Sequence, residues 1–102
     1  MKRKAKISLK PGRYVWISCE VKPGPFSDER MVKAVSAIGG DAWVGFAPVS
    51  ALKDPVVSGA TLIKALVVQV NLQKDLFDAQ PLGSPLTHTL VKEKVSLAEL
   101  VA

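Results

Sequence analysis

The sequence predicts an all-β fold, a small antiparallel barrel, on three observations. Hydrophobic and polar residues alternate along residues 13–21, which is the period of a half-buried strand. Six short segments that favour strands are separated by turns rich in glycine and proline. One of them, residues 43–47, contains Gly45 and is followed by Pro48. A glycine there indicates a bulge, a sharp bend or close approach by another backbone, and the proline predicts that regular pairing stops.

Length and composition indicate one domain. The chain has 102 residues and is 48% hydrophobic, which is enough for a globular core. A single cysteine excludes a disulfide within the chain, so a reducing compartment and a cytoplasmic location are expected. No apolar run approaches the roughly 20 residues that span a bilayer, so no membrane partner is expected. We predict a basic arm at residues 1–6 and one barrel domain at residues 7–102.

The positive charge is concentrated at the start of the chain. The net charge is +5, from 14 basic and 9 acidic residues, and the first six positions contain Lys2, Arg3, Lys4 and Lys6. The rest of the chain is close to neutral. Such an arm can contact phosphates or an acidic membrane surface, and the alternative is a solvated terminus that aids solubility.

The first strand, residues 13–21, has two distinct faces. The apolar face predicts core positions at Val15, Ile17, Cys19 and Val21. The opposite face carries Tyr14, Trp16, Ser18 and Glu20. Cys19 therefore reads as a small buried hydrophobe and not as a nucleophile.

A stiff turn over residues 22–29 follows, with Phe26 at its tip either tucked under the loop or presented to a ligand. The second strand is predicted at residues 30–38, with Val32 and Ala34 on one side and Met31, Lys33 and Val35 on the other. Residues 39–41 predict a hairpin into the strand at 43–47. Residues 49–52 then predict a single turn whose leucine returns to the core.

Residues 61–72 form the longest apolar run and fit either a strand or a buried helix. We favour a strand because Val67, Val68 and Val70 are β-branched and no capping residue is well placed. Apolar residues on both sides at 65–68 predict burial from two directions. Residues 76–80 are expected to return antiparallel, 81–85 to turn, and 86–95 to form the last strand. The S-x-x-E form of residues 96–99 predicts a capping box and a short C-terminal helix.

Part of the chain resembles a known family of RNA-binding domains. Residues 44–52 read V-G-F-A-P-V-S-A-L, and Gly59 and the valine-rich residues 65–70 follow. This order resembles the OB-fold RNA-binding repeat of the large RNA-bridging protein of the small ribosomal subunit, over about residues 43–82. The resemblance implies an OB-like barrel that binds RNA. The family usually has a histidine in the plug and a Phe-Gly-x-Phe-like pair; here Pro48 and Val49 occupy the plug, and Phe46 and Phe26 stand in for the aromatics.

The same stretch is also similar to the strand and turn that close SH3-like barrels, our second choice of fold. Residues 48–52 in particular are similar to the end of the plasmid-borne type II dihydrofolate reductase. The pocket of that family needs a Val-Gln-Ile-Tyr strand, whereas this chain has Val-Gly-Phe-Ala at residues 44–47. No reductase activity is carried across.

Side chains suited to catalysis or metal binding are sparse. The single histidine, His88, has neither a second histidine nor a nearby cysteine for a metal site, and we interpret it as structural or surface-exposed. The neighbouring carboxylates Asp28 and Glu29 are expected to point apart into solvent. No phosphate loop and no set of nucleophile, base and orienting residue is present. We therefore expect no enzyme activity, no cofactor and no metal.

The sequence favours a non-catalytic binding module. Barrel domains bind oligonucleotides by stacking bases on exposed aromatic rings beside cationic side chains. The residues expected to bind single-stranded RNA or DNA are Tyr14, Trp16, Phe26, Phe46, Arg13, Lys33, Lys2, Arg3 and Lys4. The alternative is a protein-interaction or homo-oligomerisation module in which the aromatic face at Tyr14 and Trp16 is a subunit interface, since interface cores favour such residues. In a further alternative Trp16 packs against the C-terminal helix or a second subunit, and Trp43 fills the core.

Overall fold

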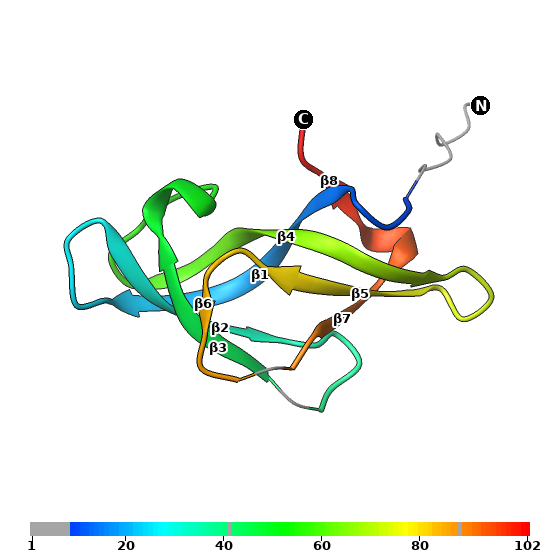
Figure 1. Ribbon diagram of the computed structural model, residues 1–102, viewed down its shortest axis with the longest axis horizontal. Coiled ribbons are helices and arrows are strands. Elements are labelled where there is room, and N and C mark those ends of the chain that lie inside the picture. Colours follow the sequence, from blue (N-terminus) through cyan, green and yellow to red (C-terminus); the bar gives the residue numbers. More distant parts are fainter. Residues whose placement is uncertain (1–8, 41, 88) are drawn as a thin grey trace.

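All strands found in the described residues belong to one antiparallel sheet that curls into a half-barrel (Figure 1). The computed structural model describes residues 9–40, 42–87 and 89–102. In the sheet the strands lie in the order β6-β3-β2-β1-β4-β5-β7, and β8 pairs with β1. The strands are β1 (Tyr14–Pro23), β2 (Glu29–Val35), β3 (Ala42–Pro48), β4 (Gly59–Asn71), β5 (Leu76–Pro81), β6 (Ser84–Pro85), β7 (Val91–Lys94) and β8 (Glu99–Leu100). Two 3-10 turns, η1 (Val49–Ala51) and η2 (Val95–Leu97), interrupt them. The all-β prediction is confirmed.

The curl of the sheet depends on the segment that contains β5 and β6. β5 pairs with β4, and two residues later β6 pairs with β3 through Gly45 and Phe46. One short segment therefore joins strands from the two sides of the sheet. At another point the amide of Ala37 donates to the carbonyl of Lys92 over 2.9 Å, which joins the end of β2 to β7. These contacts enclose the core on the concave side.

Trp43 lies at the centre of this core with 1% of its surface exposed. A Cβ atom at Gly45 would lie 2.6 Å from Cη2 of Trp43 and 2.5 Å from the carbonyl oxygen of Ser84. Gly83 is equally tight, because a Cβ there would lie 2.5 Å from the carbonyl oxygen of Phe46. Gly45 was expected to mark a bulge, a sharp bend or the close approach of another backbone. The structure shows the close approach. Pairing of β3 with β2 is regular up to Pro48, where β3 ends as predicted.

The two faces of β1 follow the predicted alternation. The core face is buried at Val15, Ile17, Cys19 and Val21. On the outer face Tyr14, Ser18 and Glu20 are exposed and Trp16 is half-buried. Apolar alternation thus placed the interior of β1 correctly.

β4 confirms the choice of strand over helix for residues 61–72, but burial from two directions does not extend to Val68. The register between β4 and β5 shifts between Val67 and Gln69, so Val68 is the extra residue of an irregularity and is 40% exposed. Ala65 and Val67 are fully buried on the core face. The prediction was wrong at Val68 because alternation from the buried Ala65 and Val67 turns this side chain outward, where nothing covers it.

The connection between β2 and β3 starts earlier than predicted. β2 ends at Val35, and the Ser36 hydroxyl accepts a hydrogen bond from the amide of Lys92 in β7. This contact draws residues 36–38 away from the strand. Gly39 and Gly40 have φ angles of +84° and +99°, which favour glycine, so the glycine turn is confirmed within the described residues. Asp41 lies outside them.

The C-terminal part differs most from the prediction. The strand expected over residues 86–95 is limited to β7, and the turn expected over 81–85 contains the end of β5 and all of β6. The capping box does not form, because both the amide and the hydroxyl of Ser96 donate to the carboxylate of Asp75 in the β4–β5 turn. The expected short helix is the single turn η2, after which Glu99 and Leu100 pair with Trp16 and Val15. No helix among the described residues is long and apolar enough to cross a membrane.

Candidate binding surfaces

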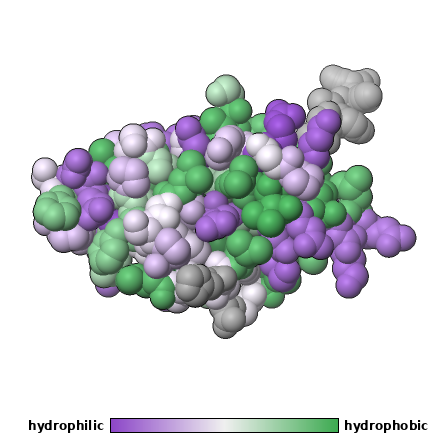
Figure 2. Space-filling model, in the orientation of Figure 1, coloured by the Kyte–Doolittle hydropathy of each residue, from purple (hydrophilic) through white to green (hydrophobic). Residues whose placement is uncertain are grey.

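The predicted site residues lie in three separate places. Within the described chain, Arg13, Tyr14 and Trp16 lie at the start of β1. Lys33 and Phe46 lie on the outer face of β2 and β3. Phe26 lies in the β1–β2 loop. Lys2, Arg3 and Lys4 lie outside the described residues. The fold does not gather the aromatic residues into one continuous platform. Figure 2 likewise shows hydrophobic residues in several patches, with hydrophilic residues between them and at the end formed by the β4–β5 turn.

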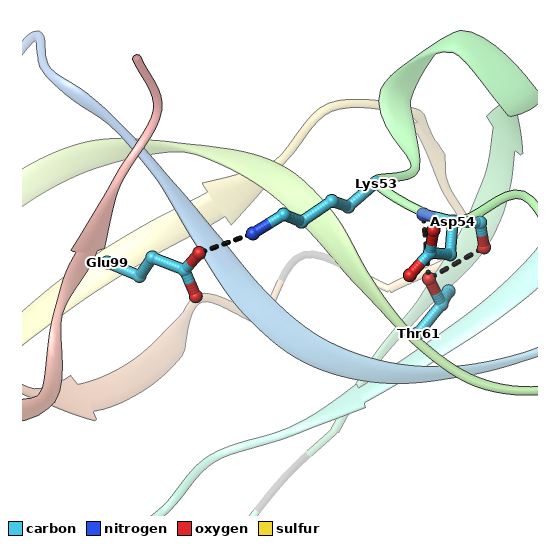
Figure 3. Close-up of polar contacts among 4 residues, drawn as sticks. All are labelled: Lys53, Asp54, Thr61 and Glu99. Atoms are coloured by element: carbon cyan, nitrogen blue, oxygen red, sulfur yellow. Dashed lines mark hydrogen bonds and ion pairs between the residues drawn. The ribbon is translucent and has the colours of Figure 1, made fainter.

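The ring of Trp16 is engaged within the chain. The Lys53 ammonium lies over the ring, 5.8 Å from its centroid, and forms an ion pair of 2.5 Å with Glu99 (Figure 3). Glu99 is also the strand partner of Trp16 in the β1–β8 pair. The loop that presents Lys53 is fixed by Thr61, whose hydroxyl accepts from the amide of Asp54 and donates to its carbonyl. One side of the indole is therefore covered by Lys53 of the same chain, and the element beside Trp16 is the strand β8 and not the expected C-terminal helix.

A second surface, the β2–β3 outer face, consists of Met31, Lys33, Val44 and Phe46 with Lys22 beside them. Lys22, Met31 and Phe46 are consecutive partners across β1, β2 and β3. In the next row Lys33 lies opposite Val44. Met31 is 37% exposed, and Phe46 and Val44 are half-buried. A shallow hollow of about 200 Å³ is lined by Glu20, Lys22, Met31, Val32, Lys33 and Val44, and Phe46 is not part of its lining.

The two lysines of this face are available to a ligand. The ion pairs found among the described residues are Lys53–Glu99 and Lys92–Asp78, and neither includes Lys22 or Lys33. Both lysines are exposed on outward strand positions. The β2–β3 outer face thus combines an aromatic ring, a thioether and two lysines, with Glu20 opposite Lys33 in the register of β1 and β2.

Arg30, the neighbour of Met31 in β2, joins two loops on the other face of the sheet, and it was not among the predicted site residues. Its side chain is 8% exposed and points to the concave side, whereas Met31 points outward. Nε donates to the carbonyl of Val56 over 2.8 Å, and Nη1 donates to the carbonyls of Ser27 and Glu29 over 3.0 and 2.9 Å. The guanidinium therefore joins the β1–β2 loop to residues 53–58. The signal in the sequence is the alternation of Arg30, Val32 and Ala34, which places the arginine on the core face of β2.

A hollow of about 280 Å³ lies beside Arg30. Its lining includes Pro25, Phe26 and Val57, and the last two are 67% and 60% exposed. Phe26 is therefore presented to solvent and not tucked under its loop.

The remaining candidate groups do not form a reactive cluster. Burial raises the pKa of the Cys19 thiol to about 11, so the thiolate is disfavoured at neutral pH. No group of three or more His, Cys, Asp or Glu side chains that suits a metal ion occurs in the described ranges, and His88 lies outside them. Asp28 is exposed and Glu29 half-buried, and no contact between their carboxylates is found.

Glu93 provides a prediction on pH dependence. It lies opposite the buried Phe77, and partial burial raises the pKa of its carboxyl above the ordinary value of 4.5. Because the pKa of Glu93 is higher in the folded than in the unfolded protein, burying its carboxylate destabilises the fold. This destabilisation is absent at a pH below the unfolded pKa and complete at a pH above the folded pKa. Glu93→Gln should therefore raise the free energy of unfolding at pH 7 and change it little at pH 3. Urea unfolding at both pH values tests this, with Glu20→Gln at an exposed position as control; equal effects at both pH values would contradict it.

Three comparisons with known proteins were without a match. No protein-family model, curated protein or solved structure matches the chain. The function must therefore be argued from the surfaces described above.

Proposed function

We propose that this protein is a non-catalytic binding module that holds single-stranded nucleic acid on the β2–β3 outer face. The observation that carries the proposal is the row of Lys22, Met31 and Phe46, with Lys33 in the adjacent row. Aromatic faces stack on any base, and cations beside them contact the phosphates. A cytoplasmic location fits this role.

The order of strand pairings supports an OB-like barrel over an SH3-like one. β1 lies between β2 and β4, and the segment of β5 and β6 pairs with both β4 and β3. OB-fold barrels are five-stranded and bind oligonucleotides on the face of their second and third strands. The same face here carries Met31, Lys33 and Phe46. The fold-level argument and the local chemistry thus favour the same surface.

The β1 aromatic face is the weaker choice for stacking. Lys53 already occupies one side of the Trp16 ring, and a base would have to displace it. Phe46 has no such cation over its ring among the interactions found in the described residues. We therefore place the stacking position at Phe46 and treat Tyr14 and Arg13 as outside the principal contact surface.

Phe46→Ala should weaken binding of single-stranded RNA about tenfold, since one base–aromatic stack contributes roughly 1–3 kcal/mol. The measurement is fluorescence anisotropy with labelled mixed-sequence RNA and DNA. Leu97→Ala, at a residue that is 73% exposed and outside this face, should leave the affinity unchanged. A loss of affinity in Trp16→Ala but not in Phe46→Ala would move the site to β1, and binding equal in all variants would contradict both locations.

Salt dependence and light scattering separate this proposal from its alternative. Phosphate contacts release counterions, so the affinity should fall steeply as salt rises. A protein-interaction or homo-oligomerisation module would instead show self-association that responds little to salt. Light scattering on the anisotropy sample measures the assembly state directly. A stable dimer with no RNA binding would overturn the nucleic-acid proposal.

A further inference from the structure

We infer that the hollow beside Arg30 binds an oxyanion, a carboxylate or a phosphate, attached to a flat apolar group. This site is separate from the β2–β3 outer face, because Arg30 and Met31 point to opposite faces of β2. It would take a small molecule, and it does not depend on the nucleic-acid proposal.

The first support is the unused hydrogen-bonding capacity of Arg30. A guanidinium has five N–H donors, and here Nε and Nη1 donate to three backbone carbonyls. Within the described chain Nη2 has no hydrogen-bond partner. No buried side-chain nitrogen or oxygen among these residues lacks a partner, so Nη2 must be reached by solvent. Arg30 lines the hollow, so Nη2 is assigned as the donor to a ligand that enters it.

The second support is the charge of the site. Only 8% of the surface of Arg30 is exposed, and yet this buried charge forms no ion pair with a described carboxylate. Burying an unpaired charge is unfavourable, and carbonyl dipoles offset only part of that cost. Arg30 is the one charged side chain that lines the hollow, and Glu29 belongs to the outward set with Met31. An anion is the ligand whose charge complements this environment.

The third support is the rigid apolar rim. Pro23 and Pro25 restrict the loop that carries Phe26, and Arg30 holds that loop against Val57 and its neighbours. Figure 1 shows the β1–β2 loop and the start of β4 at the same end of the molecule. An exposed aromatic ring on such a loop can pack against a flat group without ordering the loop first. The lining therefore fits an oxyanion on an aromatic or similarly flat carrier.

The test uses benzoate and phenyl phosphate as probes and benzamide as the neutral analogue. In NMR titrations of the folded protein, one or both anions should produce saturable shifts at the Arg30 Nε–H and the Phe26 ring, and benzamide should produce none. A response to benzoate alone assigns a carboxylate, and a response to phenyl phosphate alone assigns a phosphate. Shifts from benzamide as large as those from the anions, or no saturable shifts at all, would overturn the inference.

Variants at the rim keep the test independent of folding, because Arg30 itself supports the loops. Val57→Asp places a carboxylate at an exposed rim position, and Val57→Asn has nearly the same shape without the charge. The Asp variant should bind the anions about fivefold more weakly than the Asn variant at low salt, and the difference should shrink at high salt. Equal affinities of the two variants would contradict an oxyanion site. Phe46→Ala should not alter this binding, so failure here and failure of the nucleic-acid proposal are distinguishable.

Discussion

Gly45→Ala is expected to lower the free energy of unfolding by about 3 kcal/mol, because extra volume in a tight core forces a backbone shift. The new methyl group would lie 2.5 Å from the carbonyl oxygen of Ser84 and 2.6 Å from Cη2 of Trp43. β6 would then have to separate from β3, which opens the point where the sheet curls. Urea denaturation measures the change. Gly39→Ala is the control, since nothing lies within 4 Å of its added Cβ and only its φ of +84° opposes the side chain, which should cost about 1 kcal/mol.

A double-mutant cycle with Trp43→Phe tests the mechanism of this effect. The smaller ring removes the Cη2 and Cζ2 atoms that the new methyl group would meet, but not the carbonyl of Ser84. The two substitutions should therefore destabilise the protein less together than the sum of their separate effects. Additive effects would contradict a steric conflict with Trp43. A Gly45→Ala effect no larger than that of Gly39→Ala would contradict the close approach itself.

Arg30→Met is expected to lower the free energy of unfolding by about 3 kcal/mol, because carbonyl groups lose a charged hydrogen-bond donor. The affected carbonyls belong to Ser27 in the β1–β2 loop, Glu29 at the start of β2 and Val56 in the connection before β4. Methionine preserves the apolar stem but supplies no N–H group. Amide hydrogen exchange should also become faster in residues 24–28 and 53–58 before it changes elsewhere, since these loops lose their common anchor.

Lys33→Met is the matched control for this substitution. Lys33 lies on the same strand and has the same charge, but it is exposed on the outer face and forms no ion pair with a described residue. Its replacement should change the stability by less than about 0.5 kcal/mol. If the two variants unfolded at the same urea concentration, the three carbonyl hydrogen bonds of Arg30 would not be a stabilising anchor.

The parts of the fold that the sequence predicted are those in which local pattern and burial agree. The alternation of Val15, Ile17 and Cys19 identifies the core face of β1 because each side chain needs only its own strand to define its direction. Local pattern does not locate the irregularity in β4, where Val68 and Gln69 are both exposed after the buried Val67, since a bulge depends on the register with β5. It also fails for β6 and β8, which are two residues long and exist only because β3 and β1 present open edges to them. Ser96 shows the same limit, because its local cap is replaced by the distant carboxylate of Asp75.

The candidate sites were predictable by residue type more than by arrangement. Phe46 and Lys33 were identified as aromatic and cationic candidates, and the register places them on one face. Trp16 looked equally available in sequence, because nothing near it in the chain indicates the Lys53 ammonium over its ring. Arg30 was missed, although alternation placed it inward, because its partners are backbone carbonyls of loops and have no sequence signature.

The pairing of β8 with β1 brings the last strand of the chain to the first one (Figure 1). Closing so long a segment carries a large entropic cost, and contacts between distant residues form late in folding. The edge of β1 at Val15 and Trp16 therefore stays open until residues 99–100 are in place. During synthesis this edge is an unpaired template for other strands, and Glu99 and Leu100 are the residues that finally protect it. We therefore expect β8 to limit wrong strand pairing at this edge in addition to completing the sheet.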